Sequence, residues 1–557
     1  MAVVYMRKLE EEPETYDKNF TTLTKGVNLE VNEWILEKIG KSETILEVGC
    51  GTGSLASKMA IKGNKVMAID KNYKMISHAM QNYPIDSDVN LSYQIGTLSD
   101  FSIESQSKDI LVSTFMLSEL RPLEQQIFLR NSWKALKPGG RVLLAAEFIP
   151  TKIWKIPFKI KRWWYKKKLK LLRLNQTHLL HWFLNYLEPI GFYISDQKKW
   201  KHGAIQVLEL KKRNPSGLKK PGYYMPKLAK FKGIKSRLKI LRCLLTGQVD
   251  KVPIEPGIYQ SGNPTKDSPI IVTSNYEYTY IKVMNDLKGI DARVLCVDSN
   301  GINVWCAARG NNFENNQLLE AVEATGIQDL ATQRMLILPQ LAAGGISKPL
   351  LPEKSKSFPF IIKYGPIWSS SLPQYLKDMP NRKTEKMRVL KFSLSHRTRA
   401  FITHTSFLFR KVFLLPIVFA LALFLVLSII FPHVWTNKMI LIGEVCLWII
   451  LTNALHCFLF PISNFTRKFI NKGIFFGGIN IIVLGILTYL LHESILIILL
   501  NMSFFFWIGF FSTMSFSGYT MSTNPKEIQN EYPLFTKLNR ILLAISLTFF
   551  TIGIYFY

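Results

Sequence analysis

The chain has 557 residues, of which 48% are hydrophobic and 20% are charged, and its formal net charge is +30. This composition excludes a disordered chain, and the segments rich in Phe, Ile, Leu and Val after residue 410 exclude a wholly soluble protein. The six cysteines include no CxxC pair, which argues against a disulfide framework, a zinc finger or an iron–sulfur cluster held by this chain alone.

The first predicted element is a strand that runs into a glycine-rich turn. Residues 45–54 read ILEVGCGTGS, and a second strand, KVMAID, ends at Asp70. Closely spaced glycines let the backbone turn tightly beside a ligand, and a carboxylate at the end of the next strand can accept hydrogen bonds from both hydroxyls of a ribose. The glycine spacing is not that of dinucleotide sites, so we expect another ligand of the nucleotide type.

This turn resembles motif I of the class I S-adenosylmethionine-dependent methyltransferases. Two later segments follow the family's order: DILVS from Asp109, expected in a fourth strand, and LKPGGRVLL from Leu136, expected as a helix end, a turn and a strand. The resemblance covers residues 25–212 and implies an α/β Rossmann-like methyltransferase domain that binds S-adenosylmethionine. It further implies that the ribose lies at Asp70 and that the methionine end is lined by Glu47, Gly49, Gly51 and Gly53.

The front segment departs from this family at the adenine end. Thr97 stands where the family usually has an acid that binds the adenine amine, and Asp100 follows three residues later. The adenine contacts therefore stay open, as does the alternative of a domain that has kept the fold without the activity. No motif identifies the methyl acceptor.

A strongly basic segment follows. Between Lys152 and Arg173 the chain has ten basic residues and no acid, interleaved with Trp and Tyr. Three interpretations stay open: an amphipathic segment on an anionic membrane, a solvated face, or a site for single-stranded nucleic acid. The apolar C-terminal region favours the membrane, and we expect no nucleic acid partner. A second basic stretch, Lys211–Arg242, contains several Pro and Gly residues and predicts a linker.

Residues 268–347 alternate strand and helix patterns, which predicts a second, small α/β domain with loops for a ligand at its strand ends. The expected strands are Pro269–Ser274, Ala292–Asp298 and Met335–Leu338, and the expected helices are Tyr276–Leu287 and Asn315–Thr325.

After the second of these strands comes NGINVWCAARG. Asn303 is the expected N-cap of a short helix closed by Gly310, which places Cys306 in its first turn. The helix dipole there favours the thiolate, which is a ligand for soft metals. Cys296, on the neighbouring strand, is expected to be an inert core residue.

The string NVWCAA resembles the signature of the mercury-methylating corrinoid proteins of the HgcA type, relatives of the corrinoid iron–sulfur protein large subunit. The resemblance continues through TSNYEYTY, RMLILPQLAAGG, YGPIWSSSLPQYL and FSGYTMSTNPKEI and covers about residues 255–557. It implies that Cys306 is the lower axial ligand of a corrinoid cobalt. It also implies that further residues hold the cofactor: Asn303, Val304, Trp305 and Ala307 on the macrocycle, with Thr273, Asn275 and Gly344 in neighbouring loops. Arg309 and Gly310 replace the family's Gly-Lys. This difference leaves open that the chain is a relative whose methyl acceptor is not mercury.

Five apolar runs predict an all-α transmembrane domain of five helices, since each is near the ~20 residues that cross a bilayer. They are Val412–Pro432, Met439–Phe460, Gly473–Leu491, Ser494–Thr513 and Ile541–Tyr557. Basic residues gather before the first run and in alternate loops, which places the soluble domains in the cytoplasm and the C-terminus outside. The start of the chain has no apolar h-region of a secretory signal, which agrees with soluble domains in the cytoplasm. For Glu444, inside the second run, a helix interface and a transport path stay open.

The predicted organisation has five parts. They are a methyltransferase domain (1–213), a basic linker (214–254), a corrinoid-binding α/β domain (255–385), a basic juxtamembrane segment (386–411) and a transmembrane domain (412–557). The predicted activity is the passage of a methyl group from S-adenosylmethionine through the corrinoid to mercury(II) or a similar soft metal or metalloid. Two alternatives stay open: a methyltransferase for a lipid or small molecule beside an independent corrinoid domain, and a non-catalytic corrinoid carrier or sensor. The expected partners are the membrane, the soft metal ion and a separate ferredoxin-like reductant, because this chain lacks the cysteines for an iron–sulfur cluster.

Overall fold

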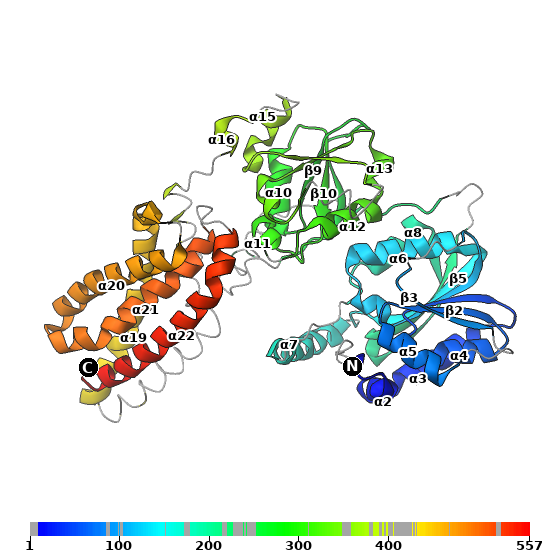
Figure 1. Ribbon diagram of the computed structural model, residues 1–557, viewed down its shortest axis with the longest axis horizontal. Helices are drawn as coiled ribbons and strands as arrows, with labels where there is room; N and C mark the ends of the chain where they lie inside the picture. Colours follow the sequence, from blue (N-terminus) through cyan, green and yellow to red (C-terminus); the bar gives the residue numbers. More distant parts are fainter. Residues whose placement is uncertain are drawn as a thin grey trace.

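The computed structural model describes most of the chain, in three successive parts (Figure 1). The described residues are 9–84, 90–98, 100, 104–150, 152–171, 179–213, 220–226, 252–309, 311–347, 358–377, 383–388, 432–466, 468–519 and 525–556, with isolated positions between 238 and 429. The first two parts are α/β domains, and the third is helical.

The front domain is built on a seven-stranded sheet in the order β3-β2-β1-β4-β5-β7-β6. Its strands are β1 (Thr44–Val48), β2 (Lys65–Asp70), β3 (Leu91–Ile95), β4 (Lys108–Thr114), β5 (Leu136–Glu147), β6 (Phe192–Trp200) and β7 (Ile205–Lys212). The first five strands are parallel, and β7 runs antiparallel to both its neighbours. The strand order reverses between β1 and β4, which is where open α/β sheets bind ligands.

Helices cover both faces of this sheet (Figure 1). The helices of this domain are α2 (Pro13–Thr24), α3 (Val27–Lys38), α4 (Ser54–Ile61), α5 (Tyr73–Asn82), α6 (Pro122–Ala135), α7 (Lys155–Leu171) and α8 (Phe183–Ile190), of which α7 projects away from the sheet (Figure 1). One core cluster joins the sheet to α3 and α4, and another joins it to α6 and α8. The segment LKPGGRVLL contains no helix, because α6 has ended at Ala135 and β5 begins at once. The expected turn is a bulge, since Lys108 pairs with Leu136 and Ile110 with Arg141.

The second domain has a five-stranded sheet in the order β12-β11-β9-β10-β8. Its strands are β8 (Gly257–Ser261), β9 (Ile270–Ser274), β10 (Ala292–Val297), β11 (Met335–Leu338) and β12 (Ile361–Tyr364). Its helices are α10 (Glu277–Asp286), α11 (Val304–Arg309), α12 (Asn315–Thr325), α13 (Ile327–Leu330), η4 (Gln340–Gly344), η5 (Ser369–Ser371), α15 (Leu372–Lys377) and α16 (Glu385–Arg388). The predicted strands and helices are confirmed to within a residue at each end. The two edge strands, β8 and β12, were not predicted.

The two α/β domains pack through α6 of the first and α12 of the second. Leu123 and Ile127 of α6 belong to the hydrophobic core of the second domain. Arg121 donates hydrogen bonds to the carboxylate of Glu320, and Arg130 Nη1 donates to the backbone oxygen of Glu323 at 2.8 Å.

Part of the expected linker belongs to the same interface. Tyr223 donates a 2.6 Å hydrogen bond to Asp329 of the second domain. The guanidinium of Arg130, from the front domain, stacks on the Tyr223 ring, 3.6 Å from the ring centre. Residues 220–226 are therefore packed between the domains, whereas most of the remaining linker lies outside the described residues.

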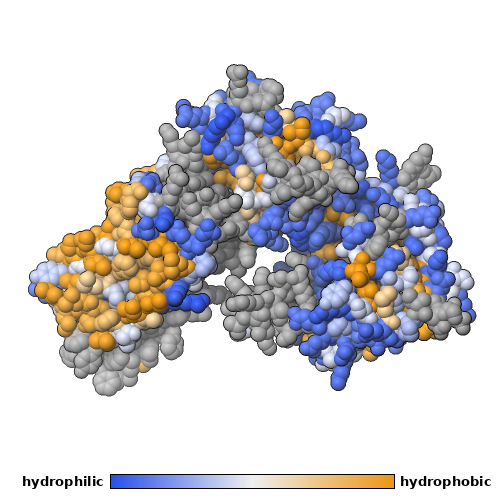
Figure 2. Space-filling view, in the orientation of Figure 1, coloured by the Kyte–Doolittle hydropathy of each residue, from blue (hydrophilic) through white to orange (hydrophobic). Residues whose placement is uncertain are grey.

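The C-terminal part consists of α19 (Pro432–Leu459), η7 (Phe460–Phe465), α20 (Phe469–His492), α21 (Ile495–Tyr519) and α22 (Pro525–Phe556). Within the described residues, four helical segments are long and apolar enough to cross a membrane: Ile440–Phe465, Phe469–His492, Ile495–Thr513 and Asn530–Ile552. Their outer surface is largely hydrophobic, in contrast with the two α/β domains (Figure 2). The first predicted run, Val412–Pro432, lies almost wholly outside the described residues.

The last apolar segment begins earlier than expected, at Asn530 rather than Ile541. The predicted start falls directly after two basic residues, Lys537 and Arg540, which were assigned to a basic loop between spans, yet α22 continues through them. Long basic side chains on a helix can extend toward water while their stems stay in an apolar environment.

Glu444 lies at a helix interface. Its two carboxylate oxygens on α19 are each 2.9 Å from Nε2 of His492, at the end of α20. This contact favours the helix-interface interpretation of Glu444 over a transport path.

Candidate functional site

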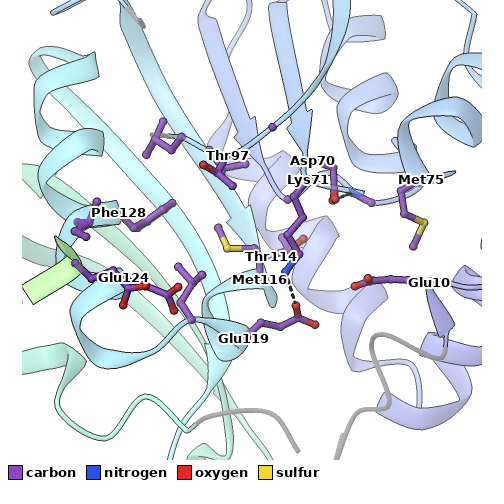
Figure 3. A pocket seen from close by; sticks show the side chains of 18 of the residues that line it. Glu10, Asp70, Lys71, Met75, Thr97, Thr114, Met116, Glu119, Glu124 and Phe128 are labelled. Carbon is purple, nitrogen blue, oxygen red and sulfur yellow. Dashed lines mark hydrogen bonds and ion pairs between the residues drawn. The ribbon is translucent and has the colours of Figure 1, made fainter. Parts of the chain in front are cut away.

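A cavity of about 280 Å³ opens in the front domain at the carboxyl ends of the parallel strands (Figure 3). Val48, Gly49 and Gly51 reach it from the end of β1, Asp70 from β2, and Thr114 from β4. The cavity therefore occupies the point at which the strand order reverses, as expected for a ligand site in an open α/β sheet.

Two of the predicted glycines are required by the backbone. Gly49 has φ +76°, and a Cβ there would lie 2.7 Å from the side chain of Met116, which also lines the cavity. Gly53 has φ +78°, and a Cβ there would lie 2.8 Å from Ala79 and from the Tyr93 hydroxyl. Gly49 and Gly51 line the cavity, whereas Gly53 packs behind it at the start of α4, so its contribution is to shape the turn.

Asp70 is positioned by backbone donors. Its Oδ2 accepts from Gly51 N at 3.0 Å and its Oδ1 from Asn72 N at 2.8 Å. Burial raises the pKa of Asp70 above its usual value, although both backbone N–H groups favour the charged form. A carboxylate has about four acceptor positions. Two donors therefore leave capacity for two hydroxyl groups from a ligand in the cavity.

Glu47 does not line the cavity. It is 1% exposed near the end of β1, and its Oε2 has no hydrogen-bond partner among the described residues. Burial raises the pKa of Glu47 to about 8, and the nearby Asp70 adds to the effect. The expected contact with the methionine end of the cofactor is therefore not seen, because the side chain points into the domain core.

Most of the charged residues on the cavity wall were not predicted. Six acidic side chains and one lysine line it, among them Glu10, Glu119 and Glu124. Lys71 forms an ion pair with Glu119 at 3.1 Å (Figure 3). Glu119 follows β4, a predicted strand, so its position in the sequence could have identified it as a cavity residue. Glu10 comes from a segment that the sequence pattern did not connect with the sheet.

Asp100 is not on the cavity. Its Oδ2 accepts from Thr97 N at 2.6 Å and from Thr97 Oγ1 at 2.8 Å, which closes the turn after β3. Thr97 itself lines the cavity. The acid nearest in sequence to the expected adenine contact is therefore used within its own loop.

A second cavity, of about 270 Å³, lies in the second domain at the carboxyl ends of β9 and β11. Thr273, Asn303 and Val304 line it, as predicted for a ligand site, together with apolar residues of the 337–341 and 366–372 segments. Thr273 is fully buried, and its hydroxyl has no hydrogen-bond partner among the described residues. A mostly apolar wall with a few polar groups is typical of sites for small molecules and cofactors.

The predicted short helix beside this cavity is confirmed as α11. Ala307 N donates to Asn303 O at 2.9 Å, which agrees with Asn303 as the residue that begins the helix. Cys306 lies on this helix, but the side chains of Trp305 and Cys306 lie outside the described residues. Cys296 is fully buried in the core, and burial raises the pKa of its thiol, which confirms the inert residue predicted there.

Three predicted cofactor residues are not brought to the second cavity. Ala307 is fully buried in the hydrophobic core beneath α11, since its small side chain faces the sheet. Asn275 accepts from Ser299 N at 2.9 Å and from Gly301 N at 3.0 Å, so it holds the loop after β10. Gly344 ends η4 and does not line the cavity.

Comparison with known proteins finds a different similarity for each of the two α/β domains. Residues 45–140 match the family model "Methyltransferase domain", and residues 232–348 match "CO dehydrogenase/acetyl-CoA synthase delta subunit". These matches confirm the predicted fold class: a Rossmann-like methyltransferase domain, a second domain like that of a corrinoid protein, and a helical apolar region.

Curated relatives resemble only part of this chain. It is 30% identical over 138 residues to the acetyl-CoA decarbonylase/synthase complex subunit gamma of Methanopyrus kandleri, covering 24% of this chain and 29% of that protein. It is 32% identical over 108 residues to the same subunit of Methanocaldococcus jannaschii, covering 19% and 22%. The chain thus spans less than a third of the length of these relatives.

Solved structures resemble the front part. An S-adenosylmethionine-dependent methyltransferase from Methanosarcina mazei is 19% identical with a TM-score of 0.28, covering 32% of this chain and 98% of that one. A putative methyltransferase of the same kind from Listeria monocytogenes is 15% identical with a TM-score of 0.27, covering 34% and 100%. The family match and the cavity geometry together identify the front part as an S-adenosylmethionine-dependent methyltransferase domain.

Proposed function

We propose that this protein is a membrane-bound methyltransferase that passes a methyl group from S-adenosylmethionine, through a corrinoid ligated by Cys306, to mercury(II) or a similar soft metal or metalloid. The observation that carries the proposal is the fusion of two α/β domains, each with a cavity at its strand ends. One cavity carries Asp70 and the glycine turn, and the other lies beside the helix that contains Cys306.

The donor half of the proposal rests on the front cavity. Asp70 would hold the ribose, Gly49 and Gly51 would let the ligand approach the backbone, and the acidic wall would favour the positive sulfonium and ammonium groups. These roles follow from the position of each residue on the cavity wall.

The corrinoid half rests on the second cavity and on the resemblance of its domain to corrinoid proteins. Thr273, Asn303 and Val304 would contact one edge of the cofactor, and the Cys306 thiolate would bind the cobalt. When bound, a corrinoid supplies a cobalt centre that can take up a methyl group and release it. A reductant is needed to keep such a centre active, and we propose a separate ferredoxin-like protein. Repeated turnover by the purified chain with only a weak chemical reductant would contradict that partner.

We further propose a multi-pass location in the cytoplasmic membrane, with the α/β domains in the cytoplasm. Four apolar helices and the basic residues that flank them support this orientation. The helix α7 supports it independently. Ile156, Ile160 and Trp164 are each more than half exposed and lie within about 80° of one another around the helix, since each residue turns about 100°.

The rest of α7 matches a helix that lies on a membrane surface. The opposite face is fixed to the front domain by buried Phe158 and by Arg162, whose Nη1 lies 3.1 Å from Glu147. Exposed Lys159 and Lys161 flank the apolar stripe on its two sides. An apolar stripe between lysines suits the boundary between acyl chains and anionic headgroups.

One observation favours a second candidate. Among the residues that the structure describes, the two cavities share no lining residue: the front cavity reaches α12, whereas the second lies at the ends of β9 and β11. The alternative is a front domain that methylates a lipid or small molecule while the corrinoid domain works independently.

A labelling experiment separates these functions. Membranes containing the full chain are incubated with methyl-labelled S-adenosylmethionine, a corrinoid and mercury(II), beside the Cys306→Ala variant. Label that passes to the corrinoid and to the metal only in the wild type supports the main proposal. Label on lipid in both proteins supports the alternative. Label on the metal that is independent of Cys306 contradicts the assigned ligand.

A further inference from the structure

The front cavity is closed at one end by the second domain. From Asp70 it extends past Thr97 and Leu98 to Ile127 and Phe128 of α6. Beyond them the wall is completed by Glu320 and Glu323 of α12, which belongs to the other domain. Thr97, Glu124 and Phe128 lie on the side of the cavity away from Glu10 (Figure 3).

This end of the cavity suits a flat heterocyclic base. A nucleoside whose ribose is held at Asp70 must direct its base to one side, and Leu98, Ile127 and Phe128 provide an apolar space for a ring there. The exocyclic amino group of adenine would then be enclosed, so it needs a hydrogen-bond acceptor. Asp100 does not reach the cavity, because its carboxylate binds Thr97.

Glu320 offers an acceptor in the required place. The carboxylate is about four-fifths buried and receives hydrogen bonds from Nη2 of Arg121. A carboxylate has about four acceptor positions, so capacity remains for a ligand. Burial raises the pKa of Glu320 to about 7, and a further donor would favour its charged form.

The packing of the two domains holds Glu320 at this position. Leu123 and Ile127 of α6 are part of the second domain's core, and Arg130 binds the backbone oxygen one turn further along α12. A carboxylate from the second domain thus faces the nucleoside cavity of the first without requiring a separate loop.

We propose that Glu320 accepts a hydrogen bond from the exocyclic amino group of the adenine of S-adenosylmethionine, so that the donor site is complete only while the two domains are packed together. This inference rests on the proposed donor function of the front domain and adds a specificity-determining residue from the second. Glu320 would take the place of the acid that the methyltransferase family usually has after β3 for the adenine amine. It also makes cofactor binding and domain packing favour each other, because each stabilises the same arrangement.

The test compares two ligands on the full-length protein by calorimetry. S-adenosylhomocysteine carries the amino group, and S-inosylhomocysteine has an oxygen in its place. We expect the wild type to bind the first about 10- to 100-fold more tightly, the range for a hydrogen bond to a charged acceptor. In Glu320→Ala the ratio should fall to near one. Glu323→Ala makes the same charge change at the other α12 acid on the cavity wall, and it should keep the wild-type ratio if Glu320 is the acceptor.

A loosened interface and a lost hydrogen bond give different results. Loosening weakens both ligands equally and leaves their ratio unchanged, whereas the lost hydrogen bond weakens only the adenosyl ligand. A ratio unaffected by Glu320→Ala, or abolished only by Glu323→Ala, overturns the inference while leaving the donor function intact. Failure of the wild type to bind S-adenosylhomocysteine overturns the donor function and this inference with it.

Discussion

Replacing Asp70 by asparagine tests the donor cavity directly. The carboxylate accepts from Gly51 N and Asn72 N and has capacity for two ribose hydroxyls. An asparagine oxygen can still accept, but the second oxygen becomes a donor and the charge is lost. Hydrogen bonds to a charged group contribute about 1.5–3 kcal/mol each, so a loss of about 2–4 kcal/mol, or roughly 30- to 1000-fold in Kd, is expected for S-adenosylhomocysteine.

The same substitution should leave the unliganded protein folded. Burial raises the pKa of Asp70, so the folded state on balance disfavours its charge, although the Gly51 and Asn72 N–H groups and Lys71 favour the charged form. A neutral side chain at this position should therefore cost the folded state little. At a ligand concentration of about 100 times the wild-type Kd, binding stabilises the wild type by about 2.7 kcal/mol, and a 100-fold weaker variant by about 0.4 kcal/mol.

Titration calorimetry and thermal unfolding with and without ligand measure these two effects. The control is Asp100→Asn, which makes the same charge change in a loop next to the cavity and should keep the affinity within a few-fold. Equal affinity of Asp70→Asn and the wild type would show that the ribose does not lie at Asp70. A large loss of stability without ligand would show that the carboxylate is structural.

Three further predictions concern other parts of the chain. Cys306→Ala should abolish the visible absorption of thiolate-ligated cobalt when a corrinoid is added, and an unchanged spectrum would refute the ligation. Burial raises the pKa of Glu47 to about 8, against about 4.3 in an unfolded chain, so its contribution to stability is present below about pH 4.3 and is lost as the pH rises through about 8. The melting temperature of Glu47→Gln should therefore fall less between about pH 6 and pH 9 than that of the wild type, and parallel curves would contradict the burial argument. In nanodiscs that contain anionic lipid, the backbone amides of α7 should exchange hydrogen more slowly in the wild type but not in the double variant Lys159→Glu/Lys161→Glu. The control variant, Lys58→Glu on α4, should behave as the wild type. Protection of α7 by RNA instead of lipid would contradict a membrane contact.

Local patterns predicted the glycine turn and its two strands in the front domain, and three strands and two helices of the second domain. The glycine turn at residues 49–53 and the strand that ends at Asp70 depend on neighbours in the chain, so their spacing specifies them. The apolar runs likewise identify α20 and α21, because the length and composition of a membrane-spanning helix are local properties. The edge strand β8 was missed because it pairs only with β10, far along the chain.

The candidate sites were predicted less completely. The resemblance to corrinoid proteins implied that Ala307 and Asn275 hold the cofactor, but packing sets the direction of a side chain on a short helix or loop. Ala307 faces the core, and Asn275 holds the loop after β10. Glu47 is on the predicted strand, yet the alternation of strand side chains directs it away from the cavity.

The sequence by itself determined the order of the three parts, the chemistry of the glycine turn and the presence of a cysteine in a short helix after a strand. These features depend on residues close together in the chain. Only the tertiary structure decided which acids line the donor cavity, because Glu10, Glu119 and Glu320 come from distant segments. It also decided that Arg121 and Glu320, far apart in sequence, join one domain to the cavity of the other. Such contacts depend on how whole faces of helices pack, and no local pattern encodes that packing.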